Sequence, residues 1–195
     1  MIRCLMLFFC ILSNLAFASN DAIMRIRCVH EESTFVKTQH GSCVAVVDPD
    51  GKLDSKRTIL TAAHVVSDPK ATILVEASEG RWVRCSVVRI NTESDLALLE
   101  CSEDLESTVE IQKNLSLTVV ASSLGENVKS NSAKLSLCQA KFKMTHGMSG
   151  GAVLTADGKL CGLITAGIGD KTGEMKGDEG VFVSMQQIRE FLKEK

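Results

Sequence analysis

The sequence has 195 residues, a formal net charge of −2 and 45% hydrophobic residues. Its acidic and basic residues are interspersed, without a block of like charges, which argues against nucleic acid as a partner. The length fits one domain with a sizeable apolar core and leaves no room for a second domain of ordinary size.

The first residues have the pattern of a signal peptide. Arg3 precedes the apolar stretch Cys4–Leu12, and the segment Ala16–Ala18 supplies the small residues of a cleavage site. An uncleaved membrane anchor is the alternative, but the apolar stretch is shorter than the about 20 residues that a spanning helix needs. We therefore expect cleavage after Ala18, no stable membrane span, and a secreted or periplasmic protein with one mature domain over residues 19–195.

Runs with strand character dominate the rest of the chain. The first six are Ile23–Val29, Cys43–Val47, Thr58–Ala62, Thr72–Ala77, Trp82–Ile90 and Leu96–Cys101. Five more follow at Leu115–Ala121, Lys134–Met144, Ala152–Thr155, Leu160–Ala166 and Val181–Met185. Turn residues lie at 48–51 and 156–159, and the glycine-rich, charged stretch between Gly167 and Gly180 predicts a mobile loop. Apolar residues at helical spacing predict a terminal helix over 186–195.

Three segments carry side chains suited to nucleophilic catalysis. His64 ends an apolar run, Asp95 begins another, and Ser149 lies in the segment GMSGG. Serine is a poor nucleophile at neutral pH, so it needs a histidine as base and a carboxylate to orient that histidine. The N–H groups of Gly147 and Ser149 are candidate donors to an oxyanion, each worth about 10²- to 10³-fold in rate. The sequence thus predicts a catalytic triad of His64, Asp95 and Ser149.

The segment GMSGG also matches the GxSxG pattern of the α/β-hydrolases, an alternative class of enzyme. In that class the serine precedes both the acid and the histidine. Here the order is His64, Asp95, Ser149, and no histidine follows the serine. The chain order therefore rejects a lipase or esterase of the α/β-hydrolase fold.

The segments TAAH, SDLALL and GMSGG resemble the signatures of the chymotrypsin-like serine proteases, with the HtrA-type bacterial branch closest in style. The resemblance begins near Gly41 and implies an all-β fold of two antiparallel six-stranded barrels with a short C-terminal helix. The first barrel would span about 23–101, and the second, with the helix, about 115–195. The interval between Asp95 and Ser149 is short, which allows an abbreviated second barrel. From the length, we expect the PDZ domain of many HtrA-type relatives to be absent.

The same resemblance implies an endopeptidase that acts on proteins or peptides through an acyl-enzyme, with neither metal nor other cofactor. It places the substrate-binding surface at Lys143, His146, Thr165, Ala166, Gly167 and Gly180. A cation at Lys143 would favour an acidic side chain before the scissile bond, whereas the alternative is that Lys143 points to solvent. His146 is expected at the rim of the pocket, because the TAAH segment already identifies the base.

Two departures from the family pattern concern activation. Met148 stands where digestive relatives have the aspartate that binds a newly cut N-terminus, and the chain lacks the isoleucine-valine-glycine-glycine activation sequence. We therefore expect no zymogen cleavage. The alternative function is a catalytically inactive binding protein on a protease scaffold, because an oxyanion site that collapses at rest would leave the triad without turnover.

Six cysteines lie beyond the signal segment: Cys28, Cys43, Cys85, Cys101, Cys138 and Cys161. Their pairing cannot be deduced from spacing, and it stays open whether any disulfide forms. Cysteines in apolar strand-like runs, such as Cys43, Cys85 and Cys101, can also serve as small buried hydrophobes. No close CxxC pair or cysteine–histidine cluster occurs, so a structural zinc site is not expected.

Overall fold

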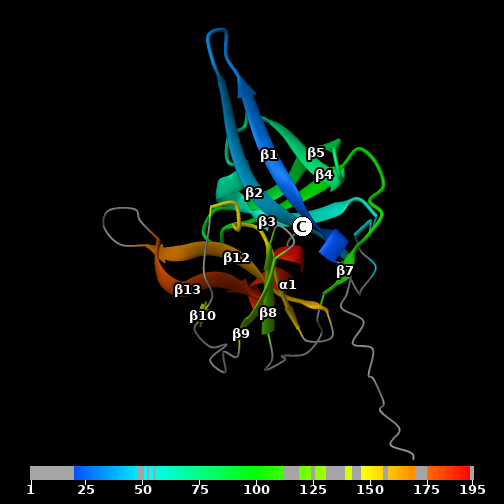
Figure 1. Cartoon of the computed structure of the whole chain (residues 1–195). Helices are drawn as coiled ribbons and strands as arrows, with labels where there is room; N and C mark the ends of the chain where they lie inside the picture. The colour runs from blue at the N-terminus through cyan, green and yellow to red at the C-terminus, as the bar shows by residue number, and fades with distance from the viewer. Residues whose placement is uncertain are drawn as a thin grey trace, which may run out of the picture.

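The computed structural model describes residues 20–47, 51, 53–54, 56–111, 119–123, 126–130, 139–141, 146–155, 158–169 and 175–193. In these residues the protein consists of two β-sheets, a short 3-10 helix η1 (Asn20–Ala22), a second 3-10 helix η2 (Ala63–Val66) and a C-terminal helix α1 (Met185–Lys193). Figure 1 shows the first sheet above the second, with α1 between them. The all-β fold class is confirmed. No helix in the described part of the chain is long and apolar enough to cross a membrane.

The first sheet closes into a barrel. Its strands are β1 (Ile23–Glu31), β2 (Val36–Val47), β3 (Thr58–Ala62), β4 (Thr72–Ser78), β5 (Arg81–Asn91) and β6 (Leu96–Cys101). They pair antiparallel in the order β1-β4-β5-β6-β3-β2, and β2 pairs again with β1. The short strand β7 (Val109–Glu110) lies parallel to the end of β2. The β1–β2 hairpin extends beyond the rest of the barrel (Figure 1).

The second sheet also has six antiparallel strands. They are β8 (Val119–Ser123), β9 (Glu126–Ser130), β10 (Gln139–Lys141), β11 (Ala152–Thr155), β12 (Leu160–Gly169) and β13 (Met175–Ser184). The order is β10-β13-β12-β11-β8-β9. Within the described residues, no pairing joins β9 to β10 to close this sheet. The helix α1 begins directly after β13.

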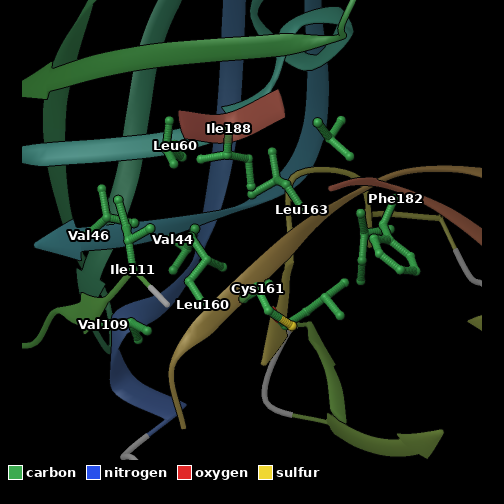
Figure 2. Close-up of a cluster of buried hydrophobic side chains, with 14 of the residues drawn as sticks. Val44, Val46, Leu60, Val109, Ile111, Leu160, Cys161, Leu163, Phe182 and Ile188 are labelled. Carbon is green, nitrogen blue, oxygen red and sulfur yellow. The ribbon is translucent and has the colours of Figure 1, made fainter. Parts of the chain in front are cut away.

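Two apolar clusters explain why several strands read as continuous apolar runs. Val44 and Leu60 belong to a cluster that both sheets share, whereas their neighbours Cys43 and Ile59 belong to a second cluster inside the first barrel. Successive side chains of a strand point to opposite faces, so β3 and the part of β2 from Gly41 to Val46 are buried on both. Figure 2 shows the shared cluster, in which Leu163 and other residues of the second sheet meet those of the first.

Three predictions about the elements need correction. The stretch 167–180 is not a loop throughout, because β12 continues to Gly169 and β13 begins at Met175. The strand β9 was not predicted. Met185 begins α1 rather than ending a strand. Parts of the predicted elements lie outside the described residues: 115–118 and 134–138 with 142–144 of two strands, 48–50 and 156–157 of two turns, 170–174 of the loop, 194–195 of the helix, and the signal segment 1–18.

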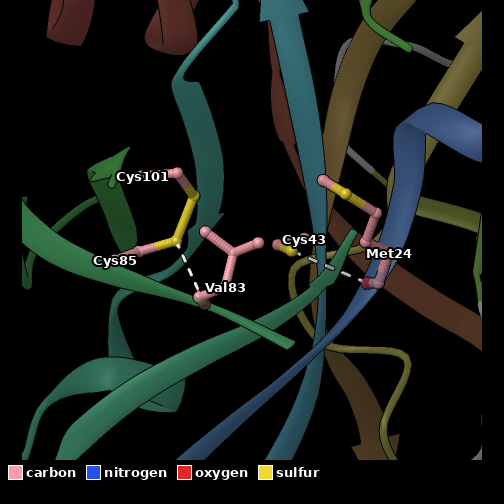
Figure 3. The surroundings of a disulfide bond; sticks show 5 residues. All are labelled: Met24, Cys43, Val83, Cys85 and Cys101. Atoms are coloured by element: carbon pink, nitrogen blue, oxygen red, sulfur yellow. Dashed lines mark hydrogen bonds between the residues drawn. A yellow bond between two sulfur atoms is a disulfide. The ribbon is translucent and has the colours of Figure 1, made fainter. Parts of the chain in front are cut away.

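A disulfide joins Cys85 to Cys101 (Figure 3). These two cysteines are register partners on the neighbouring strands β5 and β6. Cys28 and Cys43 are free and buried, Cys161 is buried and donates its Sγ–H to the Val153 carbonyl at 3.3 Å, and Cys138 lies outside the described residues. The cross-strand register therefore settles a pairing that the spacing of the cysteines left open.

Candidate active site

His64 and Asp95 come together because the strands beside them are antiparallel neighbours. Ala62 at the end of β3 pairs with Leu96 at the start of β6. His64 lies two residues after Ala62, on η2, and Asp95 directly precedes Leu96. The N–H of Ala63 donates to the Asp95 carbonyl at 3.1 Å. Asp95 has a φ of 53°, a left-handed conformation that aspartate tolerates better than most residues.

Both carboxylate oxygens of Asp95 contact His64. Oδ2 lies 2.8 Å from the ring Nδ1, and Oδ1 accepts the backbone N–H of His64 at 2.9 Å. A carboxylate can only accept, so Nδ1 of a neutral imidazole carries the proton and Nε2 is left as the base. The hydrogen bond to Asp95 raises the pKa of His64, against an opposing effect of burial, and the carboxylate charge raises it further. Two additional donors, Gln39 Nε2 at 3.0 Å and Ser67 Oγ at 3.1 Å, hold the His64 carbonyl.

The segment that carries Ser149 is held from the second sheet. Gly150 N–H donates to the Ile164 carbonyl of β12 at 2.7 Å, and Ile164 N–H donates to the Gly151 carbonyl at 2.8 Å. Gly151 N–H donates to the Met148 carbonyl at 2.9 Å, which closes the turn around the serine. Gly147 and Gly150 have φ values of 89° and 84°, which only glycine adopts without strain.

The first barrel holds the same segment from the other side. The N–H of Ser42 on β2 donates to the Ser149 carbonyl at 2.8 Å. At the neighbouring Gly41, an added Cβ would lie 2.7 Å from Val65 Cγ1 and 3.1 Å from the Ser149 carbonyl oxygen. At Gly41, β2 therefore packs against both the backbone of Ser149 and Val65, the residue that follows His64.

The hydroxyl of Ser149 donates to the Thr165 carbonyl at 3.1 Å. In the described part of the chain, no hydrogen bond joins it to His64. Transfer of its proton to His64 therefore requires the Ser149 side chain to rotate away from Thr165. The structure thus places the serine's backbone against β2 of the first barrel, with its hydroxyl turned to a neighbouring carbonyl.

The predicted oxyanion donors lie in this turn. The bond from Gly151 N–H to the Met148 carbonyl fixes the plane of the peptide between Met148 and Ser149, because a trans peptide is planar and its N–H points opposite to its C=O. Among the described residues, the N–H groups of Gly147 and Ser149 make no hydrogen bond.

The structure places four of the six predicted substrate-binding residues on paired strands. Thr165 is buried and donates its hydroxyl to the Val181 carbonyl at 3.3 Å. Ala166 pairs with Val181, and Gly167 pairs with Gly180. His146 is exposed and precedes Gly147. Lys143 lies outside the described residues, so its predicted role stays a prediction.

Sequence reasoning missed Ser42 and Thr61, two fully buried hydroxyl residues behind the serine. Ser42 Oγ donates to the Gly147 carbonyl at 2.6 Å, and Thr61 Oγ1 donates to the Ser42 carbonyl at 2.8 Å. A polar residue inside a strand that is buried on both faces was the available signal. Among the described residues, no group of three or more histidine, cysteine or acidic side chains could hold a metal ion.

A family model described as a trypsin-like peptidase domain matches residues 41–163. The match contains His64, Asp95 and Ser149 and begins at Gly41, where the motif resemblance was expected to begin. The family predicted from the motifs is therefore confirmed. A search of curated proteins finds no match to the chain.

Proposed function

We propose that this chain, which belongs to the trypsin-like peptidase family, is an exported serine endopeptidase that uses Ser149, His64 and Asp95 as its triad. One observation carries the proposal: Asp95 holds His64 through two hydrogen bonds, and the backbone of Ser149 lies against the same barrel. Family membership supplies the substrate class, which is proteins or peptides. The HtrA-type branch remains part of the proposal.

The chemistry follows from the geometry. Ser149 turns its hydroxyl from Thr165 toward Nε2 of His64, which takes the proton as Oγ attacks the scissile carbonyl carbon. The N–H groups of Gly147 and Ser149 stabilise the resulting oxyanion. Asp95 stabilises the imidazolium that forms. His64 then gives the proton to the leaving amine, and water, activated by the same histidine, hydrolyses the acyl-enzyme.

One feature supports activity without zymogen cleavage, and another supports export. The buried side chain of Met148 is uncharged, so it cannot form an ion pair with a newly cut N-terminus. The disulfide between Cys85 and Cys101 suits the oxidising environment that a signal peptide at residues 1–18 would lead to. A cleavage-site profile on a peptide mixture would test the preference for acidic side chains that Lys143 suggests.

The second candidate is an inactive binding protein on the protease scaffold. The hydrogen bond from Ser149 Oγ to the Thr165 carbonyl favours it, because that bond withholds the hydroxyl from His64. A working arrangement requires the serine side chain to rotate away from Thr165. The two candidates therefore differ in whether the rotation occurs in solution.

Labelling with a fluorophosphonate probe tests the proposal. The wild-type protein should be labelled, the Ser149→Ala variant should not, and a Ser102→Ala variant, which removes an exposed serine elsewhere, should be labelled like the wild type. Absence of labelling in wild-type protein whose folding is verified by circular dichroism would favour the binding protein. Equal labelling of the Ser149→Ala variant would contradict the assignment of the nucleophile.

A further inference from the structure

We propose that Ser42 is a positioning residue that keeps the oxyanion-binding turn open, an inference that rests on the proposed function. Ser42 lies on β2, is fully buried, and directs its hydroxyl and its N–H to the site. Its hydroxyl donates to the Gly147 carbonyl at 2.6 Å and its N–H donates to the Ser149 carbonyl at 2.8 Å. One residue of the first barrel thus holds two carbonyl groups of the turn that carries the nucleophile.

The bond to Gly147 matters because that carbonyl has little else to fix it. Gly147 has a φ of 89°, and glycine can rotate to other conformations at little cost. In the described residues, Ser42 Oγ is the donor that holds the Gly147 carbonyl. Without it, the peptide between Gly147 and Met148 could turn and direct its negative end toward the place where the oxyanion develops. A carbonyl there would repel the oxyanion that the N–H groups must stabilise.

Ser42 is itself held in place. Thr61 Oγ1 donates to the Ser42 carbonyl at 2.8 Å. Gly150 packs directly on this pair, since an added Cβ on Gly150 would overlap both the Ser42 carbonyl oxygen and Thr61 Oγ1. Because Thr61 lies on the strand that leads to His64, the same short segment that mounts the base also fixes the residue that shapes the oxyanion site. A buried serine whose hydroxyl only needed a hydrogen-bond acceptor would not require the contacts with Thr61 and Gly150.

The test compares Ser42→Ala with Thr58→Val. Thr58 is the matched control, because it is also buried in the first barrel and its hydroxyl also donates to a backbone carbonyl at 2.6 Å, that of Asp54, away from the site. Both substitutions remove one buried hydroxyl. Steady-state hydrolysis of a peptide substrate, inhibition by a peptide aldehyde, and hydrogen exchange of the segment 146–151 are measured for each variant.

Ser42→Ala should lower kcat about ten- to hundredfold with KM within about twofold, since only part of the effect of losing an oxyanion donor is expected. The affinity for the aldehyde, whose adduct carries the oxyanion, should fall by a similar factor. Hydrogen exchange at 146–151 should become about fivefold faster or more, because one hydrogen bond that holds the turn is lost. Thr58→Val should leave all three readouts unchanged.

Unchanged kcat and aldehyde affinity in Ser42→Ala, with a loss of stability like that of Thr58→Val, would overturn the proposal. Hydrogen exchange separates this failure from failure of the proposed function. If the wild-type protein hydrolyses nothing, faster exchange at 146–151 in Ser42→Ala alone still supports the positioning role, and equal exchange in wild type and Ser42→Ala overturns it.

Discussion

Replacement of Gly150 by alanine tests the contact on which the candidate site depends, that between the serine turn and the first barrel. An alanine at its φ of 84° costs about 1–2 kcal/mol in backbone strain. The new Cβ would also overlap the Ser42 carbonyl oxygen and Thr61 Oγ1, and would lie 3.1 Å from the Ala62 N. These atoms belong to buried strands, so the turn must retreat. Overpacking of this kind costs about 1–3 kcal/mol more.

Gly80 is the matched control. It has a φ of 76°, and nothing lies within 4 Å of where its Cβ would be. Gly80→Ala therefore adds the same backbone strain of about 1–2 kcal/mol without the overlap. The difference between the two variants isolates the packing of the turn on β2 and β3. We expect Gly150→Ala to be less stable than Gly80→Ala by about 1–3 kcal/mol.

Urea denaturation followed by tryptophan fluorescence of Trp82 gives both free energies of unfolding, and peptide hydrolysis gives the activity. A retreat of about 1 Å moves Ser149 from His64, and a misplacement of this size costs on the order of 10²-fold in rate. Gly80→Ala should retain wild-type activity. Equal stability of the two variants would refute the close packing of Gly150 on Ser42, whether or not the protein is an enzyme.

Three other outcomes follow from the structure. Only neutral His64 accepts a proton, and Asp95 raises the pKa of His64, so kcat/KM should fall on the acid side with a midpoint above the pKa of an ordinary histidine. Asp95→Asn should lower this midpoint and reduce kcat by about 10³- to 10⁴-fold. A midpoint that does not move in Asp95→Asn would contradict the pairing of Asp95 with His64. Burial raises the pKa of Cys28 to about 11, so iodoacetamide at pH 8 should alkylate it about 10²-fold more slowly in folded than in unfolded protein, as mass spectrometry can measure. Replacing Cys85 and Cys101, 16 residues apart, by alanine should lower the free energy of unfolding in urea by about 3 kcal/mol, and a loss below about 1 kcal/mol would argue against the bond.

The sequence predicted strands best where both faces are buried. The runs Thr58–Ala62, Leu96–Cys101 and Ala152–Thr155 have the predicted bounds, because burial on both faces requires a continuous apolar run with clear ends. The strand Glu126–Ser130 and the first half of Met175–Ser184 lack such a run. Both pair with the strand that directly precedes them, β9 with β8 and Met175 of β13 with Gly169 of β12, so the pairing is local, but no alternating or continuous apolar pattern indicates it.

The same distinction applies to the candidate site. The motifs identified His64, Asp95 and Ser149 as candidates, because each lies in a distinctive local context. The distance between His64 and Asp95 depends on the pairing of β3 with β6, which the motifs do not contain. Ser42 was missed for a related reason: its polar side chain within an apolar run was visible in the sequence, but its importance depends on partners at 2.6 and 2.8 Å that the sequence does not contain.

The His64–Asp95 pair and the Ser149 turn are held by different parts of the fold, and this difference indicates which movement would convert a resting site into a working one. His64 and Asp95 are fixed within the first barrel, whereas the Ser149 turn is bonded to Ile164 of one sheet and Ser42 of the other. The shared cluster, with Leu163 fully buried, packs the two sheets together, so relative motion of the sheets would expose apolar surface. Rotation of the Ser149 hydroxyl away from Thr165 breaks one hydrogen bond. The smaller movement is therefore the one that would bring the nucleophile into line.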